Sequence, residues 1–310
     1  MKNQKETEGG DVVLITGCSS GIGLALAKVF YLQQDSRVII TARPRSIGVL
    51  HKLFTESDRV IIRELDITDD KNISHLITEV FLKWRRIDIL INNAGICYRS
   101  VVEHMDEESE LHQLKTNYLG PMSLIRAILP AMRDRGFGHI VNISSASGML
   151  SMPTMGSYSA SKSALQSASE ALWYELKPFG VKVSIVQPGF VNSNSFNNVC
   201  YPKKAQLSLS LDAPYSSYYT SFSRFVAKLM KLSPTNPDQI AQQIAKLVRK
   251  KNPPLWIPVS VDIQLYSFLR FILPQKVFHP IMFKLLPNPS AWIRRQAASP
   301  SLEETSERIF

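Results

Sequence analysis

Near its N-terminus the chain passes within a few residues from an apolar β-branched run to a glycine and then to helical periodicity. Residues 12–16 form the apolar run, Gly17 ends it, and apolar positions spaced by three or four then continue to residue 33. That spacing is typical of a helix that buries one face, while a short apolar run without polar alternation suits a strand buried on both faces. The order of these features predicts a strand, a glycine turn and a helix, the opening unit of a parallel α/β sheet.

The alternation of strand and helix continues along the chain. Further strands are predicted at residues 37–41, 60–64, 87–91, 139–143, 181–186 and 255–259. Further helices are predicted at residues 45–55, 73–84, 107–132 with an internal irregularity, 158–176, 215–232 and 238–249. Strands that alternate with helices of this length indicate α/β class: a single-domain, doubly wound parallel sheet (Rossmann fold) with helices on both faces.

The charge balance and the cysteines narrow the class of protein. Lys and Arg outnumber Asp and Glu by 36 to 26, and the net charge of +10 suits an anionic membrane surface, a phosphate-bearing ligand or nucleic acid. The basic residues are scattered in short clusters, which argues against nucleic acid. Cys18, Cys97 and Cys200 lie far apart without metal-ligand spacing, so we expect no metal and a reducing compartment. The polar N-terminus has no apolar signal segment, which favours a cytoplasmic location, with membrane association left open.

The first predicted strand leads directly into Thr16-Gly17-Cys18-Ser19-Ser20-Gly21-Ile22-Gly23, which opens the first predicted helix. This is the position of a dinucleotide-binding fingerprint, in which glycines allow a tight turn and let the backbone approach a pyrophosphate. The free N–H groups and the dipole of the helix N-terminus favour the phosphates. The residues expected to bind the cofactor here are Thr16, Gly17, Ser19, Ser20, Gly21, Ile22 and Gly23.

Arg43, just after the second predicted strand, bears on the choice between NAD and NADP. An NAD-binding Rossmann unit has an acidic residue there for the ribose 2′-OH, whereas an arginine accommodates the 2′-phosphate of NADP. NADP(H) is therefore favoured, with NAD(H) as the alternative because Ser20 in the glycine loop is not basic. After the third predicted strand, Asp66 and the backbone of Ile67 are expected at the adenine, unless Asp66 serves only as a cap.

Tyr158 and Lys162 are four residues apart in a predicted helix, which puts the phenol and the ammonium one turn apart on the same face. An ammonium beside a tyrosine favours the phenolate, so it lowers the phenol pKa from about 10. The pair is a candidate acid/base for an alcohol. Ser145, at the end of the preceding strand, is placed to polarise the same substrate oxygen, with Ser144 as the second choice. Alone such a pair usually means two surface neighbours, but beside a dinucleotide fingerprint it predicts a hydride-transfer site.

Six motifs in order resemble the short-chain dehydrogenase/reductase family over residues 11–189. They are the glycine loop from Thr16 to Gly23, Asn92-Asn93-Ala94-Gly95 after the fourth strand, Asn117, Ser145, Tyr158 with Lys162, and Pro188-Gly189 after the sixth strand. Residues 14–24 are similar to the hydroxysteroid and retinol dehydrogenase branch. The resemblance implies an oxidoreductase that acts on CH–OH groups with a nicotinamide cofactor and no metal.

The resemblance also implies residue roles. Tyr158 would be the acid in reduction and the base in oxidation, and Lys162 would lower its pKa and hold the nicotinamide ribose. Ser145 would orient and polarise the carbonyl, while Asn117 would kink its helix and hold a water in a proton relay. Cofactor contacts are further implied for Asn93, Ala94, Gly95, Tyr158, Lys162, Pro188, Gly189 and Val191.

The regular pattern breaks after Gly189. Residues 192–214 are rich in Asn, Ser and Pro and have little periodicity, so an irregular segment is expected there. Because ligands of a doubly wound fold bind beyond the carboxyl ends of the strands, residues 190–232 are expected to form a substrate lid, with an ordinary surface loop as the alternative. The expected organisation is a disordered N-terminus (1–10), a catalytic domain with the lid (11–260), an amphipathic extension (261–298) and a polar tail (299–310).

Residues 261–286 are strongly apolar but broken by charges and prolines, so they cannot form a membrane-spanning helix. The interruptions are Arg270, Lys276, Lys284, Pro274 and Pro280. Two short amphipathic helices with basic edges are predicted. Two interpretations stay open: packing on the domain's own core or a second subunit, and peripheral attachment to a membrane interface.

The sequence says least about the substrate. An apolar pocket is expected from Met149, Met152, Met155, Phe190, Phe196 and Phe222, unless these are ordinary core residues. With the apolar C-terminal segment they favour a steroid, a retinoid or another lipid-like carbonyl or alcohol. A homodimer or homotetramer is expected. The alternative function is a dinucleotide-binding sensor or scaffold of the same fold that does not turn over.

Overall fold

The computed structural model describes residues 10–193, 198–210 and 215–287, so the expected polar tail and parts of the expected lid lie outside the described residues. Its centre is a seven-stranded sheet in the order β3-β2-β1-β4-β5-β6-β7, with every neighbouring pair parallel. The strands are β1 (Asp11–Ile15), β2 (Ser36–Ala42), β3 (Val60–Glu64), β4 (Ile89–Asn92), β5 (Gly138–Ile143), β6 (Val181–Gln187) and β7 (Trp256–Pro258). The strand order reverses between β1 and β4, which confirms the doubly wound sheet and directs a ligand to the carboxyl ends of these strands.

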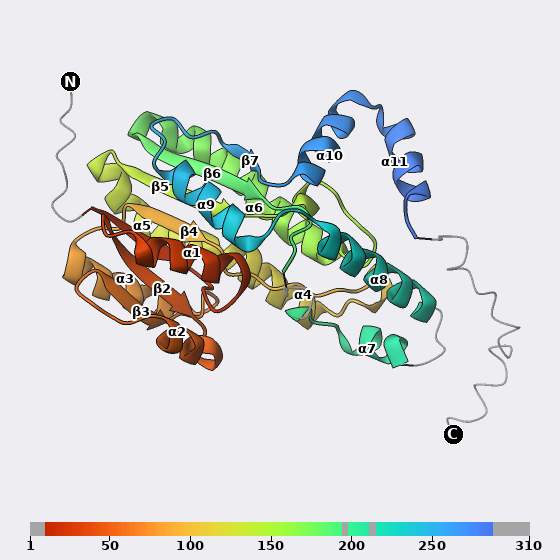
Figure 1. Ribbon diagram of the computed structural model, residues 1–310, viewed down its shortest axis with the longest axis horizontal. Coiled ribbons are helices and arrows are strands. Elements are labelled where there is room, and N and C mark those ends of the chain that lie inside the picture. The colour runs from red at the N-terminus through yellow and green to blue at the C-terminus, as the bar shows by residue number, and fades with distance from the viewer. Residues whose placement is uncertain (1–9, 194–197, 211–214, 288–310) are drawn as a thin grey trace, which may run out of the picture.

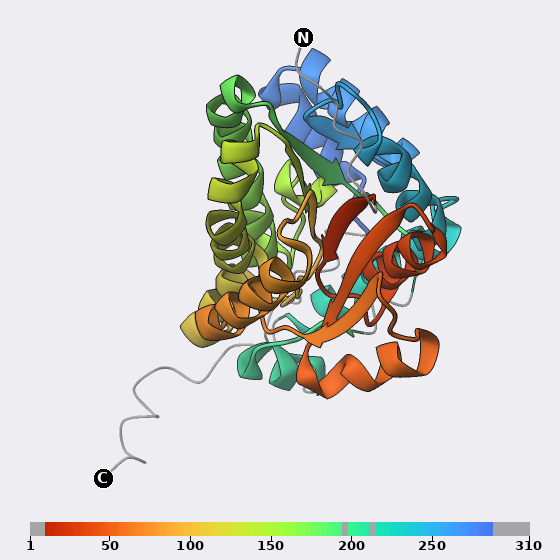
Figure 2. The ribbon, with the colours of Figure 1, turned by 90° about the vertical axis from the view of Figure 1, so that its left-hand side faces the viewer.

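Helices cover both faces of the sheet (Figure 1 and Figure 2). Those of the first two thirds of the chain are α1 (Gly21–Leu32), α2 (Ile47–Leu53), α3 (Asp70–Trp84), α4 (Glu107–Leu114), α5 (Gly120–Arg135) and α6 (Gly156–Leu176). The later ones are α7 (Lys203–Ser210), α8 (Ser216–Leu232), α9 (Pro237–Val248), α10 (Val261–Ile272) and α11 (Gln275–Lys284). α1, α2 and α9 pack on one face, and α3, α5 and α6 pack on the other.

Strand β1 shows why its sequence carries no polar alternation. Val13 and Ile15 lie in the core beneath α1 and α9, whereas Val12 and Leu14 lie in the core on the opposite face. All four side chains are fully buried, because successive side chains of a strand point to opposite faces and both faces are covered. The glycine turn that follows is therefore held on a rigid base.

The segment 107–132 is divided, as its internal irregularity predicted. α4 and α5 are joined by a π-helical turn at Lys115–Leu119, and the buried Asn117 stands in that turn. A π-helical turn inserts one residue into the α-helix and so shifts the direction of its side chains. Such turns are frequent at functional sites.

The prediction of an irregular segment at residues 192–214 was wrong in one part, because α7 (Lys203–Ser210) lies within it. α7 buries the small Ala205 and the polar Ser208, while Leu207 is exposed. A helix whose buried face is small and polar leaves little hydrophobic periodicity in the sequence.

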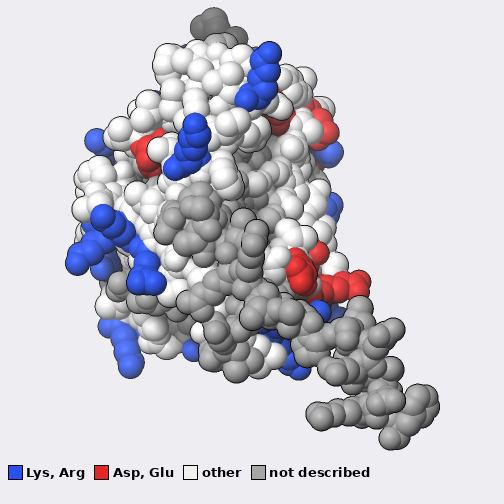
Figure 3. Space-filling model, turned by 90° about the vertical axis from the view of Figure 1, so that its right-hand side faces the viewer, with Lys and Arg blue, Asp and Glu red and all other residues white. Residues whose placement is uncertain are grey.

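The C-terminal segment forms α10 and α11, so the two short helices predicted for residues 261–286 are confirmed. With α7 and α8 they lie beyond the end of the sheet at which the strands end, on the right in Figure 1. Lys and Arg side chains are spread over this face of the molecule, while Asp and Glu gather at a few places (Figure 3). No described helix has the length and apolar character needed to cross a bilayer.

Candidate active site

The glycine loop between β1 and α1 has a shape that only glycines allow. Gly17 has φ +71°, and a methyl group there would lie 2.7 Å from the Cα of Ala94. A methyl group on Gly23 would lie 2.2 Å from the carbonyl oxygen of Gly17, so the helix start and the loop touch backbone to backbone. Gly21, by contrast, has open space around it and is needed for its φ of +56°.

The first turn of α1 suits a phosphate. This turn contains no acidic residue. The exposed Ser20 stands at the N-cap, and in the described structure its side chain accepts no hydrogen bond from the first N–H groups of the helix. The first N–H groups of a helix then remain available to an anion, and the helix dipole favours one. Ser19 is half-buried beside it, whereas Ile22 packs against the core. The loop and the helix start together fit a dinucleotide pyrophosphate.

Asn93 ties the end of β4 to this loop. Its Nδ2 donates to the carbonyl oxygens of Thr16 at 2.9 Å and Gly17 at 3.1 Å. In return the Oγ1 of Thr16 accepts the N–H groups of Asn93 and Ala94, both at 3.0 Å. The predicted residues of the two motifs therefore form one network across the switch point of the sheet.

The ends of β2 and β3 hold Arg43 and Asp66. Burial lowers the pKa of Arg43, its neighbour Arg45 lowers it further, and Asp66 opposes both. The Oδ1 of Asp66 accepts the N–H and the hydroxyl of Thr68, while the cap of α3 is Asp69. Asp66 thus shapes a turn without capping the helix, and Ile67 beside it is buried.

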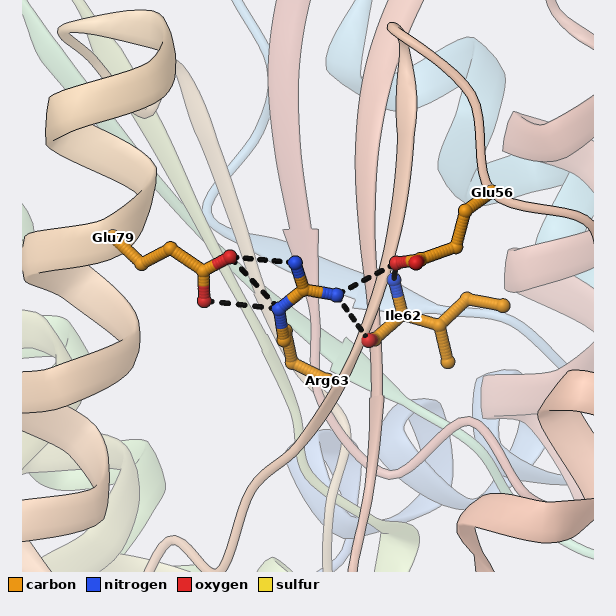
Figure 4. Close-up of polar contacts among 4 residues, drawn as sticks. All are labelled: Glu56, Ile62, Arg63 and Glu79. Carbon is orange, nitrogen blue, oxygen red and sulfur yellow. Dashed lines mark hydrogen bonds and ion pairs between the residues drawn. The ribbon is translucent and has the colours of Figure 1, made fainter.

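Edge strand β3, which leads to Asp66, is fixed to helix α3 by Arg63. Its guanidinium contacts Glu79 of α3 at 2.6 Å and Glu56 at 2.6 Å, and Glu56 also accepts the N–H of Ile62 (Figure 4). The pKa of Arg63 is raised, and the main cause is its hydrogen bond to Glu79. These ion pairs are partly exposed, so they contribute positioning more than stability.

Tyr158 and Lys162 lie one turn apart on α6, as the spacing predicted, with the Lys162 Nζ 5.9 Å from the centre of the phenol ring. The Nζ donates to the carbonyl oxygen of Ile143 at 2.9 Å, at the end of β5. Burial lowers the pKa of Lys162 to about 8. Burial raises the pKa of Tyr158, Cys97 adds to the rise, and the interaction of the phenol with the Ser145 side chain opposes it.

The expected lowering of the Tyr158 pKa is therefore wrong for the chain by itself. Burial disfavours the charged phenolate, and Lys162 is not among the groups that shift this pKa in the free chain. The spacing of the pair was readable from the sequence, but the depth of its burial was not.

The two serines after β5 have different surroundings. The Ser144 hydroxyl is buried and accepts a hydrogen bond from the Nε2 of Gln166 at 2.8 Å. This bond holds α6 against the sheet. Ser145 is only half-buried; its Oγ accepts the N–H of Ser147 at 3.1 Å and interacts with the phenol of Tyr158. Of the two hydroxyls, that of Ser145 faces the tyrosine.

Asn117 reaches from the π-helical turn to the same place. Its Oδ1 accepts the N–H of Ile96 at 2.9 Å, and its Nδ2 donates to the Ile96 carbonyl at 2.9 Å and to the Ser161 hydroxyl at 3.0 Å. A methyl group on Gly95 would lie 3.2 Å from that Oδ1 and 3.6 Å from the Nζ of Lys162. The structure thus brings Gly95, Asn117 and Lys162 together, and the relay water stays a prediction.

The turn after β6 is held by two residues that the sequence analysis missed. The N–H of Gly189 donates to the Ser260 hydroxyl at 2.9 Å, and the N–H of Phe190 donates to the Asp262 carboxylate at 2.8 Å. Asp262 fits so closely that a methyl group on Gly189 would lie 2.1 Å from its Oδ2. The sequence does contain a signal for a helix start here, a serine followed two residues later by an acid. It contains no local signal that this helix start binds the distant turn after β6.

The remaining predicted residues belong to the turn after β6 and to the predicted apolar pocket. Val191 is buried behind the turn, and Pro188 accepts the N–H of Ala146 at 2.7 Å through its carbonyl oxygen, so the turns after β5 and β6 are joined. Of the predicted pocket residues, Phe222 is fully buried in α8 with its ring 5.5 Å from the guanidinium of Arg99, and Phe196 lies outside the described residues. Sequence analysis missed Arg99 too, a buried cation that also donates to Thr154 at 3.2 Å.

Taken together, a dinucleotide-shaped loop and a Tyr–Lys–Ser–Asn group at neighbouring strand ends define the class of a nicotinamide-dependent α/β oxidoreductase. The profile of the family described as "short chain dehydrogenase" matches residues 11–202. The chain belongs to this family, which confirms the resemblance. It is an oxidoreductase of the dehydrogenase/reductase type.

Relatives and solved structures agree with this assignment. The chain is 34% identical over 275 residues to the dehydrogenase/reductase SDR family protein 7-like of Drosophila melanogaster, covering 87% of this chain and 78% of that protein. It is 32% identical to the 3-ketodihydrosphingosine reductase of Bacteroides thetaiotaomicron, over 82% of this chain and 89% of that protein. A short-chain dehydrogenase from Streptomyces avermitilis has a similar structure, with a TM-score of 0.72 and 30% identity over 96% of this chain and 99% of its own.

Proposed function

We propose that the chain transfers hydride between NADP(H) and a carbonyl or secondary alcohol of a hydrophobic substrate, with Tyr158 as the acid/base. The observation that carries the proposal is the convergence of Tyr158, Lys162, Ser145 and Asn117 beside the glycine loop. A bound nicotinamide would supply or accept the hydride. All four side chains lie at or close to the carboxyl ends of β4 and β5, where this fold binds its ligands.

Reduction of a carbonyl requires a proton donor at the substrate oxygen. Tyr158 remains a phenol in the free chain because burial raises its pKa, so it holds the proton that the carbonyl oxygen receives as hydride reaches the carbon. Ser145 donates a hydrogen bond to the same oxygen and lowers the cost of its developing negative charge. The product is the alcohol, and Tyr158 is left as a phenolate.

Lys162 stabilises that phenolate. Its ammonium lies one turn away at 5.9 Å from the ring, in surroundings from which water is largely excluded. Two opposite charges attract strongly at such a distance when little water separates them. In the oxidation direction the same attraction makes the phenolate a base. The Asn117 amide positions Ile96 and Ser161 around this group.

A preference for NADP(H) over NAD(H) is supported by Arg43. The residue follows β2 directly, no acidic side chain occupies the end of that strand, and its guanidinium is partly buried next to Arg45. Two basic groups suit a 2′-phosphate. Asp66, Ile67, Asn93, Ala94, Gly189 and Val191 remain the proposed contacts for the rest of the cofactor.

A lipid-like substrate is supported by the surroundings of Tyr158 and by one relative. Met149 contacts an apolar cluster on α10, and Met155 approaches Cys97 at 3.9 Å beside the tyrosine. The relative from Bacteroides thetaiotaomicron is named a 3-ketodihydrosphingosine reductase. A steroid, a retinoid or a long-chain ketone is therefore the proposed substrate class, and residues 190–232 are the proposed lid.

The proposal extends to the setting of the enzyme. The three cysteines are unpaired, which supports a reducing compartment such as the cytoplasm. A homodimer or homotetramer, the division at residues 260 and 261, and a peripheral membrane contact through residues 261–286 remain predictions.

The test is oxidation of NADPH and NADH against a panel of steroid, retinoid and long-chain carbonyls. Turnover of at least one hydrophobic carbonyl with NADPH is expected. Tight NADPH binding without turnover on any member of the panel would instead favour the sensor or scaffold alternative.

A further inference from the structure

We propose that helices α10 and α11 form a docking surface for an anionic lipid bilayer, lying on the interface beside the substrate site. This goes beyond the expected membrane contact by assigning the face, the anchoring side chains and the lipid charge. The docking itself does not depend on the proposed reaction; only its use for substrate access does.

The inner side of the helix pair is already occupied. Ile263, Tyr266 and Phe278 are buried in one cluster, where they contact Ala146 and Met149 from the segment that follows Ser145. The Arg270 guanidinium donates to the carbonyl oxygen of Met149. Packing on the domain's own core therefore explains one stripe of apolar residues on α10, and it holds the helix in place.

A second apolar stripe faces away from the molecule. On α10 the residues Val261, Leu265, Phe268 and Ile272 follow spacings of four, three and four, which places them on one face of the helix. They are exposed by 67, 58, 59 and 49%. On α11 and just after it the exposed large apolar side chains are Val277, Ile281, Phe283 and Leu285. Large apolar groups concentrated in this way mark an interaction surface.

The charges around the stripe select the partner. Between Val261 and Leu286 the only acidic residue is Asp262, and its carboxylate is bonded to the turn at Phe190. Lys276 and Lys284 are exposed on α11. Apolar side chains with basic neighbours are the composition of helices that lie in an anionic membrane interface. In a contact with a second copy through residues 261–286, these lysines would find no free acidic side chain of the same segment to pair with, because Asp262 is already hydrogen-bonded.

The docking surface lies close to the proposed chemistry. α10 holds the Gly189 turn through Ser260 and Asp262 and contacts the segment after Ser145 with its inner side. Its outer stripe is separated from these contacts only by the width of a helix, about 10 Å. A hydrophobic substrate dissolved in the bilayer would then enter next to Tyr158 without crossing much water.

The test is flotation of the full-length chain with vesicles of phosphatidylcholine, with and without phosphatidylglycerol. Binding to the anionic vesicles is expected, with loss in high salt because screening weakens the lysine contacts. A Leu265→Ser/Phe268→Ser variant should bind about tenfold more weakly or worse, because each change removes apolar area from the interface. Lys276→Gln/Lys284→Gln should bind anionic vesicles more weakly as well.

A matched control is Leu32→Ser, since Leu32 is 74% exposed on α1, away from the C-terminal helices. It should float like wild type. Absence of wild-type flotation, or flotation unchanged in the Leu265/Phe268 variant, would overturn the proposal. So would light scattering that shows a wild-type dimer and a monomeric Leu265/Phe268 variant, which would assign the face to a second copy. None of these readouts needs turnover, so failure here is separate from failure of the proposed reaction.

Discussion

Replacing Gly23 by alanine should damage the cofactor site far more than its small size suggests. The new methyl group would lie 2.2 Å from the Gly17 carbonyl oxygen and 2.4 Å from the Asn93 Nδ2. Both neighbours belong to the network that joins the glycine loop to β4, and neither is the free end of a flexible side chain. The loop or the helix start must therefore move.

The size of the effect follows from what that movement breaks. Overpacking costs about 1–3 kcal/mol, and the two hydrogen bonds from Asn93 are worth about 1 kcal/mol each. A total of about 3–5 kcal/mol corresponds to a fall in melting temperature of about 6–20 °C for a domain of this size. Because the displaced atoms line the proposed pyrophosphate site, NADPH affinity should fall by about tenfold or more as well.

The assay combines thermal unfolding with titration of NADPH by fluorescence. Gly48→Ala is the control, because Gly48 lies in α2 with no atom near the added methyl group and should gain slightly in stability. If Gly23→Ala keeps both the wild-type melting temperature and the wild-type NADPH affinity, the close approach is not real and the proposed cradle is wrong.

Other predictions concern the cofactor, the turn after β6 and pH. Arg43→Ala should weaken NADPH at least tenfold while leaving NADH nearly unchanged, measured by KM for each; equal losses would argue against a 2′-phosphate contact. Asp262→Ala removes a charge-assisted hydrogen bond worth about 1.5–3 kcal/mol, so the cofactor KM should rise more than kcat falls, with Gln264→Ala on the same helix as control. Burial lowers the pKa of Lys162 from 10.5 to about 8, so wild type should lose stability relative to Lys162→Met as pH falls from 10.5 to 8. Chemical denaturation of both proteins across that range measures the effect. If the lysine were solvated, the difference in unfolding free energy between the two proteins would stay constant.

The parts of the structure that depend on neighbouring residues were readable from the sequence. The glycine turn after β1 and the four-residue step from Tyr158 to Lys162 both act within one element or one turn. The doubly wound sheet followed from the repeated alternation of such units, and the interruption near Asn117 was visible as broken periodicity.

Contacts between distant segments could not be read in the same way. The bond from Phe190 to Asp262 joins residues 72 positions apart, and neither residue is unusual in its local surroundings. Sequence analysis already preferred Ser145 to Ser144, but it did not show the hydrogen bond from Gln166 that holds the Ser144 hydroxyl. The pKa of Tyr158 depends on burial rather than on its spacing from Lys162. α7 was missed because it buries Ala205 and Ser208 in place of large apolar side chains.

The central claim is that Tyr158 supplies the proton in hydride transfer, and it is tested most directly by Tyr158→Phe on a carbonyl that wild type reduces. The account predicts that kcat falls by about 100- to 10,000-fold while NADPH binding and the melting temperature stay close to wild type, since only the hydroxyl is removed. Full reductase activity in the folded variant would contradict the account.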